Sequence, residues 1–180
     1  AEALEEALAD EGYGPTVRAE ARAVSVDEYS REPSGELSVR QVATRKDLED
    51  SMQVQDVAFG DGRAHTQAEI DGFLQACTGR ARRVFRYLAY GQDSAGPIST
   101  GCMTAFPSLR FGLLWGAGTV PKARGRGGYT ALVAARIANA RKLGLTHVGL
   151  YALVDTSAPI VARQGFSCHG TIRYWDRPPR

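Results

Sequence analysis

The sequence predicts an α+β fold with a mixed β-sheet, and three observations lead to this prediction. From residue 37 to residue 120, segments with the periodicity of one strand, two helices and three strands follow one another. A strand, a glycine-rich loop, a helix and a further strand come next and form a βαβ unit, which requires one parallel strand pair. The length of 180 residues, with 43% apolar and 23% charged side chains, suits one well-packed domain.

A short segment precedes this domain. Leu4, Ala7 and Leu8 have helical spacing, and apolar residues then alternate with charged ones from residue 17 to residue 23, as in a half-buried strand. The polar run Arg31–Gly35 predicts a linker. We therefore divide the chain into a helix-strand extension with its linker, residues 1–36, and a main domain, residues 37–180. About 30 residues cannot bury a core alone, so the extension must pack on something.

The extension resembles a later part of the chain. Residues 7–13 and residues 160–166 both predict the end of a helix, a glycine-aromatic pair and a following strand. We hypothesise that residues 1–30 are the tail of a degenerate preceding half, or an added strand that completes the sheet. A strand at residues 17–26 that pairs with no sheet would exclude both.

Two helix starts in the main domain are marked by capping residues. Thr44 with Asp47, and Thr66 with Glu69, have the spacing of an N-cap and an acidic residue in the first turn. The predicted elements of this domain are a strand at 37–42, helices at 44–59 and 66–78, strands at 84–90, 98–106 and 111–120, a helix from about 128 to 143, a strand at 147–153, a short helix at 158–163 and a last strand through Ile172 and Trp175.

Composition excludes several classes of partner. The formal net charge of +2 is too small for a surface that contacts many phosphates, so we expect no nucleic acid partner. No run approaches the roughly 20 apolar residues of a membrane helix, and the acidic start is unlike a signal peptide. We expect a cytoplasmic protein without a membrane partner. Cys77, Cys102 and Cys168 lack the paired spacing of a zinc site or a disulfide framework, so we expect reduced thiols and no metal.

The chemistry is concentrated in the loop before the helix at residue 128. Residues 124–130 read Arg-Gly-Arg-Gly-Gly-Tyr-Thr. Glycines let backbone amides approach a ligand, the helix N-terminus attracts anions, and the two arginines add charge-assisted contacts. The pattern predicts a pyrophosphate site. A Walker loop would need Gly-Lys-Ser/Thr and a dinucleotide fold a glycine motif after its first strand, and neither is present. An RNA-binding Arg-Gly-Gly segment and a glycine turn without a ligand remain as alternatives.

These residues resemble a known family. The run from Thr119 to Leu132 resembles the acetyl-CoA signature of GNAT N-acetyltransferases, Arg/Gln-x-x-Gly-x-Gly/Ala after a strand. Residues 157–166, a short helix that ends in Gly-Phe before the last strand, resemble the second motif of that family. The resemblance extends from about Leu37 to Trp175 and includes the order of the elements.

The resemblance implies a mostly antiparallel sheet flanked by helices, with a splayed strand pair at the cofactor site. The pantetheine arm of acetyl-CoA would lie along the edge of one of these strands, and the loop would hold its pyrophosphate. The reaction would be attack of a primary amine on the thioester. The residues implied in cofactor binding are Ala117, Thr119, Arg124, Gly125, Arg126, Gly127, Gly128, Tyr129 and Thr130.

The sequence also departs from the family pattern. Tyr129 replaces the last small residue of the signature, so only its backbone can repeat the usual role. Val161 stands where a tyrosine often protonates the departing thiolate, and the strand before the loop lacks the glutamate that often serves as base. No catalytic residue is therefore assigned. The nearest ionisable substitutes are Tyr151 and Asp155.

Three functions stay open at this stage. The first is an acetyl-CoA-dependent N-acetyltransferase that acts on the primary amine of a small molecule. The second is a non-catalytic acyl-CoA-binding or regulatory domain, which the empty acid and base positions favour. The third is a protein acetyltransferase. His169 is a weaker candidate for a base, and Trp115 for a residue of the acceptor groove. A homodimer is among the oligomeric states that the sequence allows.

Overall fold

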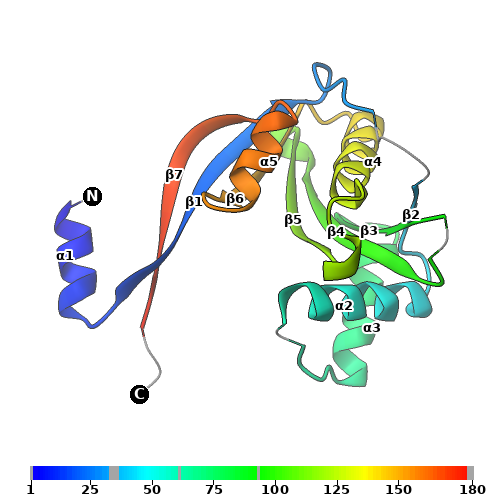
Figure 1. Ribbon diagram of the computed structural model, residues 1–180, viewed down its shortest axis with the longest axis horizontal. Coiled ribbons are helices and arrows are strands. Elements are labelled where there is room, and N and C mark those ends of the chain that lie inside the picture. The colour runs from blue at the N-terminus through cyan, green and yellow to red at the C-terminus, as the bar shows by residue number, and fades with distance from the viewer. Residues whose placement is uncertain (1, 33–36, 61, 93, 178–180) are drawn as a thin grey trace. The chain divides into compact units, whose positions relative to one another are not determined.

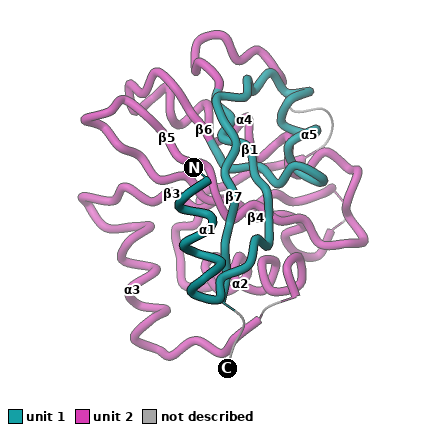
Figure 2. The backbone as a smooth tube through the Cα atoms, turned by 90° about the vertical axis from the view of Figure 1, so that its left-hand side faces the viewer, with its two compact units in different colours: residues 1–23, 150–180 teal, residues 24–149 magenta. Residues whose placement is uncertain are grey.

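The computed structural model describes residues 2–32, 37–60, 62–92 and 94–177. The chain forms two compact units, coloured separately in Figure 2: residues 1–23 together with 150–180 (unit 1), and residues 24–149 (unit 2). Unit 2 contains most of the predicted main domain. Of the expected linker, residues 33–35 lie outside the described residues, and the predicted domain boundary after residue 36 stays a prediction.

Unit 2 is a mixed sheet with helices on both faces. Its strand order is β2-β3-β4-β5-β6, and every described pairing is antiparallel except that of β5 with β6. The mixed, mostly antiparallel sheet confirms the predicted fold class. The elements are β2 Ser38–Gln41, α2 Arg45–Phe59, α3 Gln67–Thr78, β3 Val84–Tyr90, β4 Pro97–Phe106, β5 Phe111–Thr119, α4 Gly128–Lys142 and β6 His147–Leu153, whose second half belongs to unit 1.

The helices of unit 2 cover opposite faces of the sheet. In Figure 1, α4 lies on one side of β3, β4 and β5, and α2 with α3 lies on the other. Leu132 and Ile137 bring the apolar stripe of α4 into the core, and Leu48 of α2 packs with Leu88 of β3 from the other side. One face is therefore covered by α4 and the other by α2 and α3.

Both predicted capping boxes are present. The Thr44 hydroxyl accepts a bond from the Asp47 amide at 3.1 Å, and the Asp47 carboxylate accepts one from the Thr44 amide at 3.0 Å. Thr66 and Glu69 repeat this arrangement at the start of α3. Bonds from the backbone and side chain of Thr66 and from Arg63 lower the pKa of Glu69 to about 2.

The carboxylate of Asp47, in the first turn of α2, makes the stability of the fold depend on pH. Burial opposes its ionisation, but bonds from the Thr44 hydroxyl and from the backbone amides of Ala43 and Thr44, together with Arg40 at 2.7 Å, lower its pKa below the usual range. A lowered pKa stabilises the fold above the ordinary carboxyl pKa near 4, and this stabilisation disappears as the pH falls through the folded-state value.

We therefore expect Asp47→Asn to cost about 1 kcal/mol of stability at pH 7. The difference from the wild type should shrink as the pH falls from about 4 through the lower pKa that Asp47 has in the folded state, because the wild-type carboxylate becomes protonated over this range. Urea unfolding at pH 7, 5 and 3 measures both values. A gap that stays constant across this range would show that the charge of Asp47 does not matter.

Strand β5 carries a bulge before the glycine-rich loop. Its register against β4 changes between the pair Trp115–Cys102 and the pair Gly118–Thr100, so that β5 contains one extra residue there. Gly116 adopts φ +57°, in the left-handed region that glycine occupies at little cost, which allows the bulge. The bulge redirects the last part of β5, including Ala117 and Thr119.

Unit 1 contains the predicted N-terminal helix and strand. The strand expected at residues 17–26 is β1, and it pairs antiparallel with β7, so the condition that would have excluded the added-strand hypothesis is not met. Only Ala19 of β1 is buried within the part of this strand that belongs to unit 1, so the expected alternation is weak. The elements of the unit are α1 Glu2–Asp10, β1 Gly14–Ser25 as far as residue 23, the second half of β6, α5 Ser157–Arg163 and β7 Ser167–Asp176.

The two helix-strand segments of unit 1 are built alike. After α1 the Tyr13 amide donates to the Leu8 carbonyl at 2.9 Å, and after α5 the Phe166 amide donates to the Val161 carbonyl at 3.1 Å. Leu8 and Val161 therefore occupy equivalent positions in the two segments. With the same offset in residue number, the β1–β7 pair Gly14–Asp176 is equivalent to the pair Ser167–Ala23. The β1–β7 ribbon is therefore symmetric about a local two-fold axis. This supports the hypothesis that the extension repeats the C-terminal segment.

Candidate functional site

The glycine-rich loop presents an uncapped helix start. It follows β5 through a 3-10 turn, Pro121–Ala123, and leads into α4. Gly127 is the N-cap of α4 at φ +83° and has no side chain with which to cap it. A residue with a Cβ is strained in this conformation, so glycine is required. The first amides of a helix have no partner within the helix, and here they stay available to an anion.

Gly128 allows the helix to approach the sheet closely. A Cβ at this position would overlap Ser99 Oγ and would stand 3.3 Å from Ser99 Cβ. Ser99 is fully buried on β4, and its hydroxyl lies 2.8 Å from that of Thr119 at the end of β5. The start of α4 is therefore fixed against β4 and β5. This contact holds the glycine-rich loop next to the end of β5, the strand expected to bind pantetheine.

The two arginines of the loop have different surroundings. Arg124 braces the loop, since its Nε donates to the Thr119 carbonyl at 3.4 Å and its Nη2 to the Ala58 carbonyl at 3.3 Å. The exposed guanidinium of Arg126 makes no hydrogen bond or ion pair with the described residues, and its Nη2 lies near Gly91. Of the two cations, Arg126 is the one that is free to meet a phosphate.

The side chain of Tyr129 is not presented to a phosphate, because it is largely buried. Burial raises the pKa of its phenol, and the nearest charge acting on it is that of Arg136, which is fully buried. Arg136 donates through Nη1 to the Cys102 carbonyl at 3.1 Å and through Nε to the Leu132 carbonyl at 3.0 Å. Burial lowers the pKa of this guanidinium. Only the backbone of Tyr129 is thus available at the loop, as the sequence suggested.

One edge of β5 becomes open toward its end. The parallel ladder with β6 covers Phe111 to Leu113, opposite residues 147–149. For the remaining part of β5, the described pairings are those with β4. Unpaired strand edges bind extended ligands through their backbone groups. Ala117 and Thr119, the residues expected to meet the pantetheine, lie in this part of the strand.

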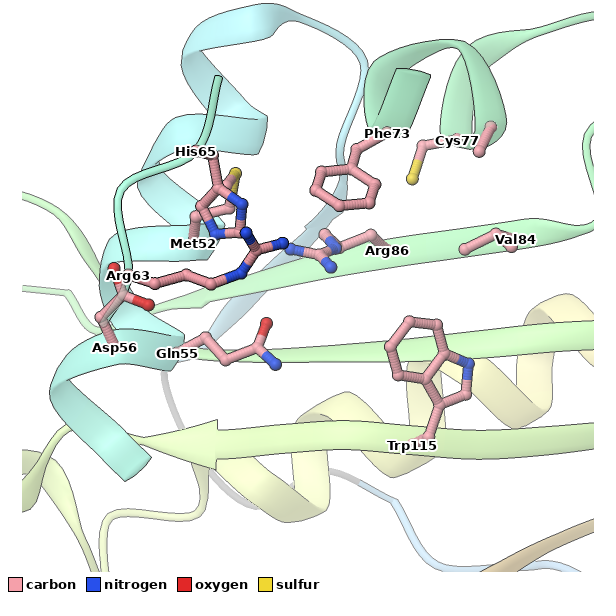
Figure 3. A pocket seen from close by; sticks show the side chains of 11 residues that line it. Met52, Gln55, Asp56, Arg63, His65, Phe73, Cys77, Val84, Arg86 and Trp115 are labelled. Carbon is pink, nitrogen blue, oxygen red and sulfur yellow. The ribbon is translucent and has the colours of Figure 1, made fainter. Parts of the chain in front are cut away.

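A cavity of about 350 Å³ lies on the other face of the sheet in unit 2, between β3, β5, α2, α3 and the segment before α3 (Figure 3). Its size suits a small molecule. Trp115 lines it and donates from the indole nitrogen to Thr104 Oγ1 at 2.9 Å, in agreement with the expected place in an acceptor groove. The described lining consists of Met52, Gln55, Asp56, Arg63, His65, Phe73, Ala76, Cys77, Val84, Arg86 and Trp115.

The cavity contains residues that sequence reasoning missed. Phe73, on the apolar stripe of α3, is 38% exposed because it faces the cavity and meets the His65 ring edge-on at 5.7 Å. Arg86 is only 9% exposed although it lies in the middle of β3. The available signal was a single charged residue within the apolar run Val84–Tyr90, which is unusual for an inner strand.

Comparison with known proteins identifies the architecture. No protein-family profile matches the sequence, and no curated protein does either. Among solved structures, a GCN5-related N-acetyltransferase from Sphaerobacter thermophilus matches with a TM-score of 0.76 and 20% identity, over 99% of this chain and 57% of its own. One from Kribbella flavida matches with a TM-score of 0.71 and 19% identity, over 98% and 64%. An acetyltransferase from Trypanosoma brucei matches with a TM-score of 0.63 and 16% identity, over 74% and 94%.

The chain has the GNAT fold. It spans about three fifths of the length of the Sphaerobacter and Kribbella proteins. Within this fold, the loop of residues 124–130 follows the bulged strand β5 and leads into α4, in the order that the sequence predicts. No helix in the part of the chain that the structure describes is both long enough and apolar enough to cross a membrane.

Neither of the two positions at which the resemblance to GNAT proteins implies a catalytic acid or base carries an ionisable side chain in this chain. Val161 is fully buried in α5. The substitutes considered from the sequence, Tyr151, Asp155 and His169, are exposed residues of unit 1. None of them is among the described residues that line the cavity, whereas Asp56 and His65 are. The Nδ1 atom of His65 is buried without a hydrogen-bond partner among the described residues.

Proposed function

We propose that the protein is an acetyl-CoA-dependent N-acetyltransferase that acts on the primary amine of a small molecule. The observation that carries the proposal is the start of α4, where the N-cap Gly127 supplies no capping side chain and the exposed side chain of Arg126 precedes it. This arrangement suits a diphosphate. The neighbouring edge of β5 suits the amide groups of pantetheine. The residues that would hold the cofactor are those expected from the sequence.

Catalysis in this proposal comes mainly from placing the amine against the thioester. Positioning of two reactants contributes roughly 7–11 kcal/mol in well-oriented systems. The amine arrives protonated and must lose its proton before attack. Asp56 and His65 are the groups lining the cavity that can accept it. Attack by the nitrogen gives a tetrahedral oxyanion, which backbone donors stabilise. As the carbon–sulfur bond breaks, the nitrogen releases its second proton to water and the departing thiolate takes up a proton from water, because Val161 offers none.

The second candidate is an acyl-CoA-binding domain without activity, and the missing acid and glutamate favour it. A protein acetyltransferase is a third, but the bounded cavity of about 350 Å³ suits a small acceptor better than a peptide groove. Cytoplasmic location and the absence of nucleic acid and membrane partners stay predictions from composition. That the protein forms a homodimer, one of the oligomeric states that the sequence allows, also stays a prediction.

Titration calorimetry with acetyl-CoA, CoA, ATP and NADH tests the cofactor. We expect tight binding of the two CoA species and none of NADH, because the site lacks the features of a dinucleotide fold. Release of free thiol with a panel of amines then tests transfer. CoA binding without thiol release would favour the regulatory candidate, and no CoA binding would refute the cofactor assignment.

A further inference from the structure

Arg86 is a buried cation without a counterion. It is 9% exposed, and its Nε has no hydrogen-bond partner among the described residues. The other contacts of the guanidinium are with neutral groups, a long bond of 3.3 Å from Nη1 to Ser51 Oγ and a side-chain bond to the Cys102 thiol. No carboxylate pairs with it within the described ranges. A buried charge without a partner is costly, so proteins retain one mainly where a ligand or a function requires it.

The thiols beside Arg86 do not compensate its charge. Cys77 and Cys102 lie close enough to act on it electrostatically, but burial raises the pKa of both thiols. They are therefore neutral at pH 7. Both cysteines are buried free thiols.

The cavity gives Arg86 access to a ligand. Figure 3 shows the Arg86 side chain extending from β3 into the cavity, and that of Arg63 reaching it from the segment before α3. Arg63 is exposed and pairs with Glu69 at 2.9 Å, so its charge is partly balanced. Asp56 of α2 adds one carboxylate to the lining. The lining thus contains the buried cation of Arg86, the exposed cation of Arg63 and the carboxylate of Asp56.

We propose that the acceptor is a small amine that also carries a carboxylate, which Arg86 binds at the bottom of the cavity. A guanidinium presents two parallel N–H donors that match the two oxygens of a carboxylate. Asp56 is placed to attract the ammonium group of the same molecule. As a statement about the acceptor, this inference rests on the proposed function, but the carboxylate site itself can be tested without acetyl transfer.

Matched amines that differ only by the carboxylate test the proposal. The pairs are alanine with ethylamine and phenylalanine with phenethylamine. We expect the wild type to favour the α-carboxylate member of at least one pair by about 10- to 100-fold in kcat/KM, the range of a charge-assisted bond. Arg86→Met should remove this preference, by lowering kcat/KM for the α-carboxylate member of a pair more than for its carboxylate-free partner. Arg86→Lys should keep a weaker preference, because it retains the charge without the planar fork.

Stability separates a binding role from a structural one. Arg86→Met removes an uncompensated buried charge, so its Tm should equal or exceed that of the wild type. A lower Tm would mean that the guanidinium supports the fold and would contradict the proposal. Arg80→Met, at an exposed arginine after α3, is the matched control and should change neither property. If Arg86→Met fails to fold, the Arg86→Lys comparison decides.

Binding without acetyl-CoA distinguishes this inference from the proposed function. Thermal-shift titration of the wild type with the same amines should show stabilisation by the carboxylate-bearing members, and loss of it in Arg86→Met. If no amine releases thiol but this pattern appears, the acetyltransferase proposal fails and the carboxylate site stands. Transfer without carboxylate preference would refute the site alone. A stronger response to phosphoethanolamine than to any amino acid would refute the carboxylate assignment.

Discussion

Arg126→Ala is expected to weaken the binding of CoA about 10- to 100-fold and to leave the Tm unchanged. The side chain of Arg126 is exposed and makes no hydrogen bond with the described residues, so truncating it breaks no side-chain contact among them. A charge-assisted bond to phosphate contributes roughly 1.5–3 kcal/mol, which corresponds to that range of affinity. Calorimetry at two salt concentrations measures the effect. The wild-type advantage should fall as salt rises, because the contact is solvent-exposed.

Arg124→Ala is the matched comparison for this prediction. Arg124 is bonded to the carbonyls of Thr119 and Ala58, and its loss should lower the Tm as well as the affinity. The two variants therefore separate a cation that binds from a cation that braces. Equal losses of Tm in both would contradict the assignment. An unchanged affinity in Arg126→Ala would place the phosphates elsewhere.

Gly128→Ala is expected to lose about 1–3 kcal/mol of stability, the usual cost of an overpacked contact, and to weaken CoA binding at the same time. The new Cβ would overlap the buried Ser99 hydroxyl, so either that hydroxyl turns away from Thr119 or the start of α4 moves off the sheet. Both changes disturb the loop that leads into the helix. Urea unfolding and CoA calorimetry on the same sample measure the two losses.

A double variant tests the cause of this effect. Ser99→Ala removes the overlapped atom, so Ser99→Ala combined with Gly128→Ala should recover part of both losses, and the interaction energy of the cycle should be favourable. Gly72→Ala is the control, because Gly72 lies in α3 with nothing within 4 Å of the new Cβ. It should stabilise the protein by about 0.5–1 kcal/mol through helix propensity. Strict additivity of Ser99→Ala and Gly128→Ala would locate the strain at another contact.

The local features of this protein were readable from its sequence. The bounds of α2 and α3 agree with the predictions because Thr44, Asp47, Thr66 and Glu69 satisfy the first helical amides within a few residues. Strand β6 was predicted with its observed bounds, and the glycine-rich loop precedes α4 as expected. These signals depend on neighbours in the chain, so a single sequence contains them.

The repeat in unit 1 could be recognised only from the sequence and the structure together. The sequence predicted a helix, a glycine-aromatic pair and a strand at each end of the chain, but such a short pattern can arise by chance. The pairing of β1 with β7 in a register that is symmetric between the two segments became visible only in the structure. Register is a relation between distant strands, and the sequence of either one does not specify it.

What the sequence determined by itself is the order of the elements and the place of the glycine-rich loop before α4, while the tertiary structure decided the surroundings of each charged residue. Arg124 and Arg126 are two positions apart and look equivalent in sequence, yet Ala58 of α2 engages only Arg124. Arg86 reads as one polar residue in a strand until α2 and α3 close over it and leave it buried beside a cavity. The energy of a charge depends on its solvent and its neighbours, which only the packed fold brings together.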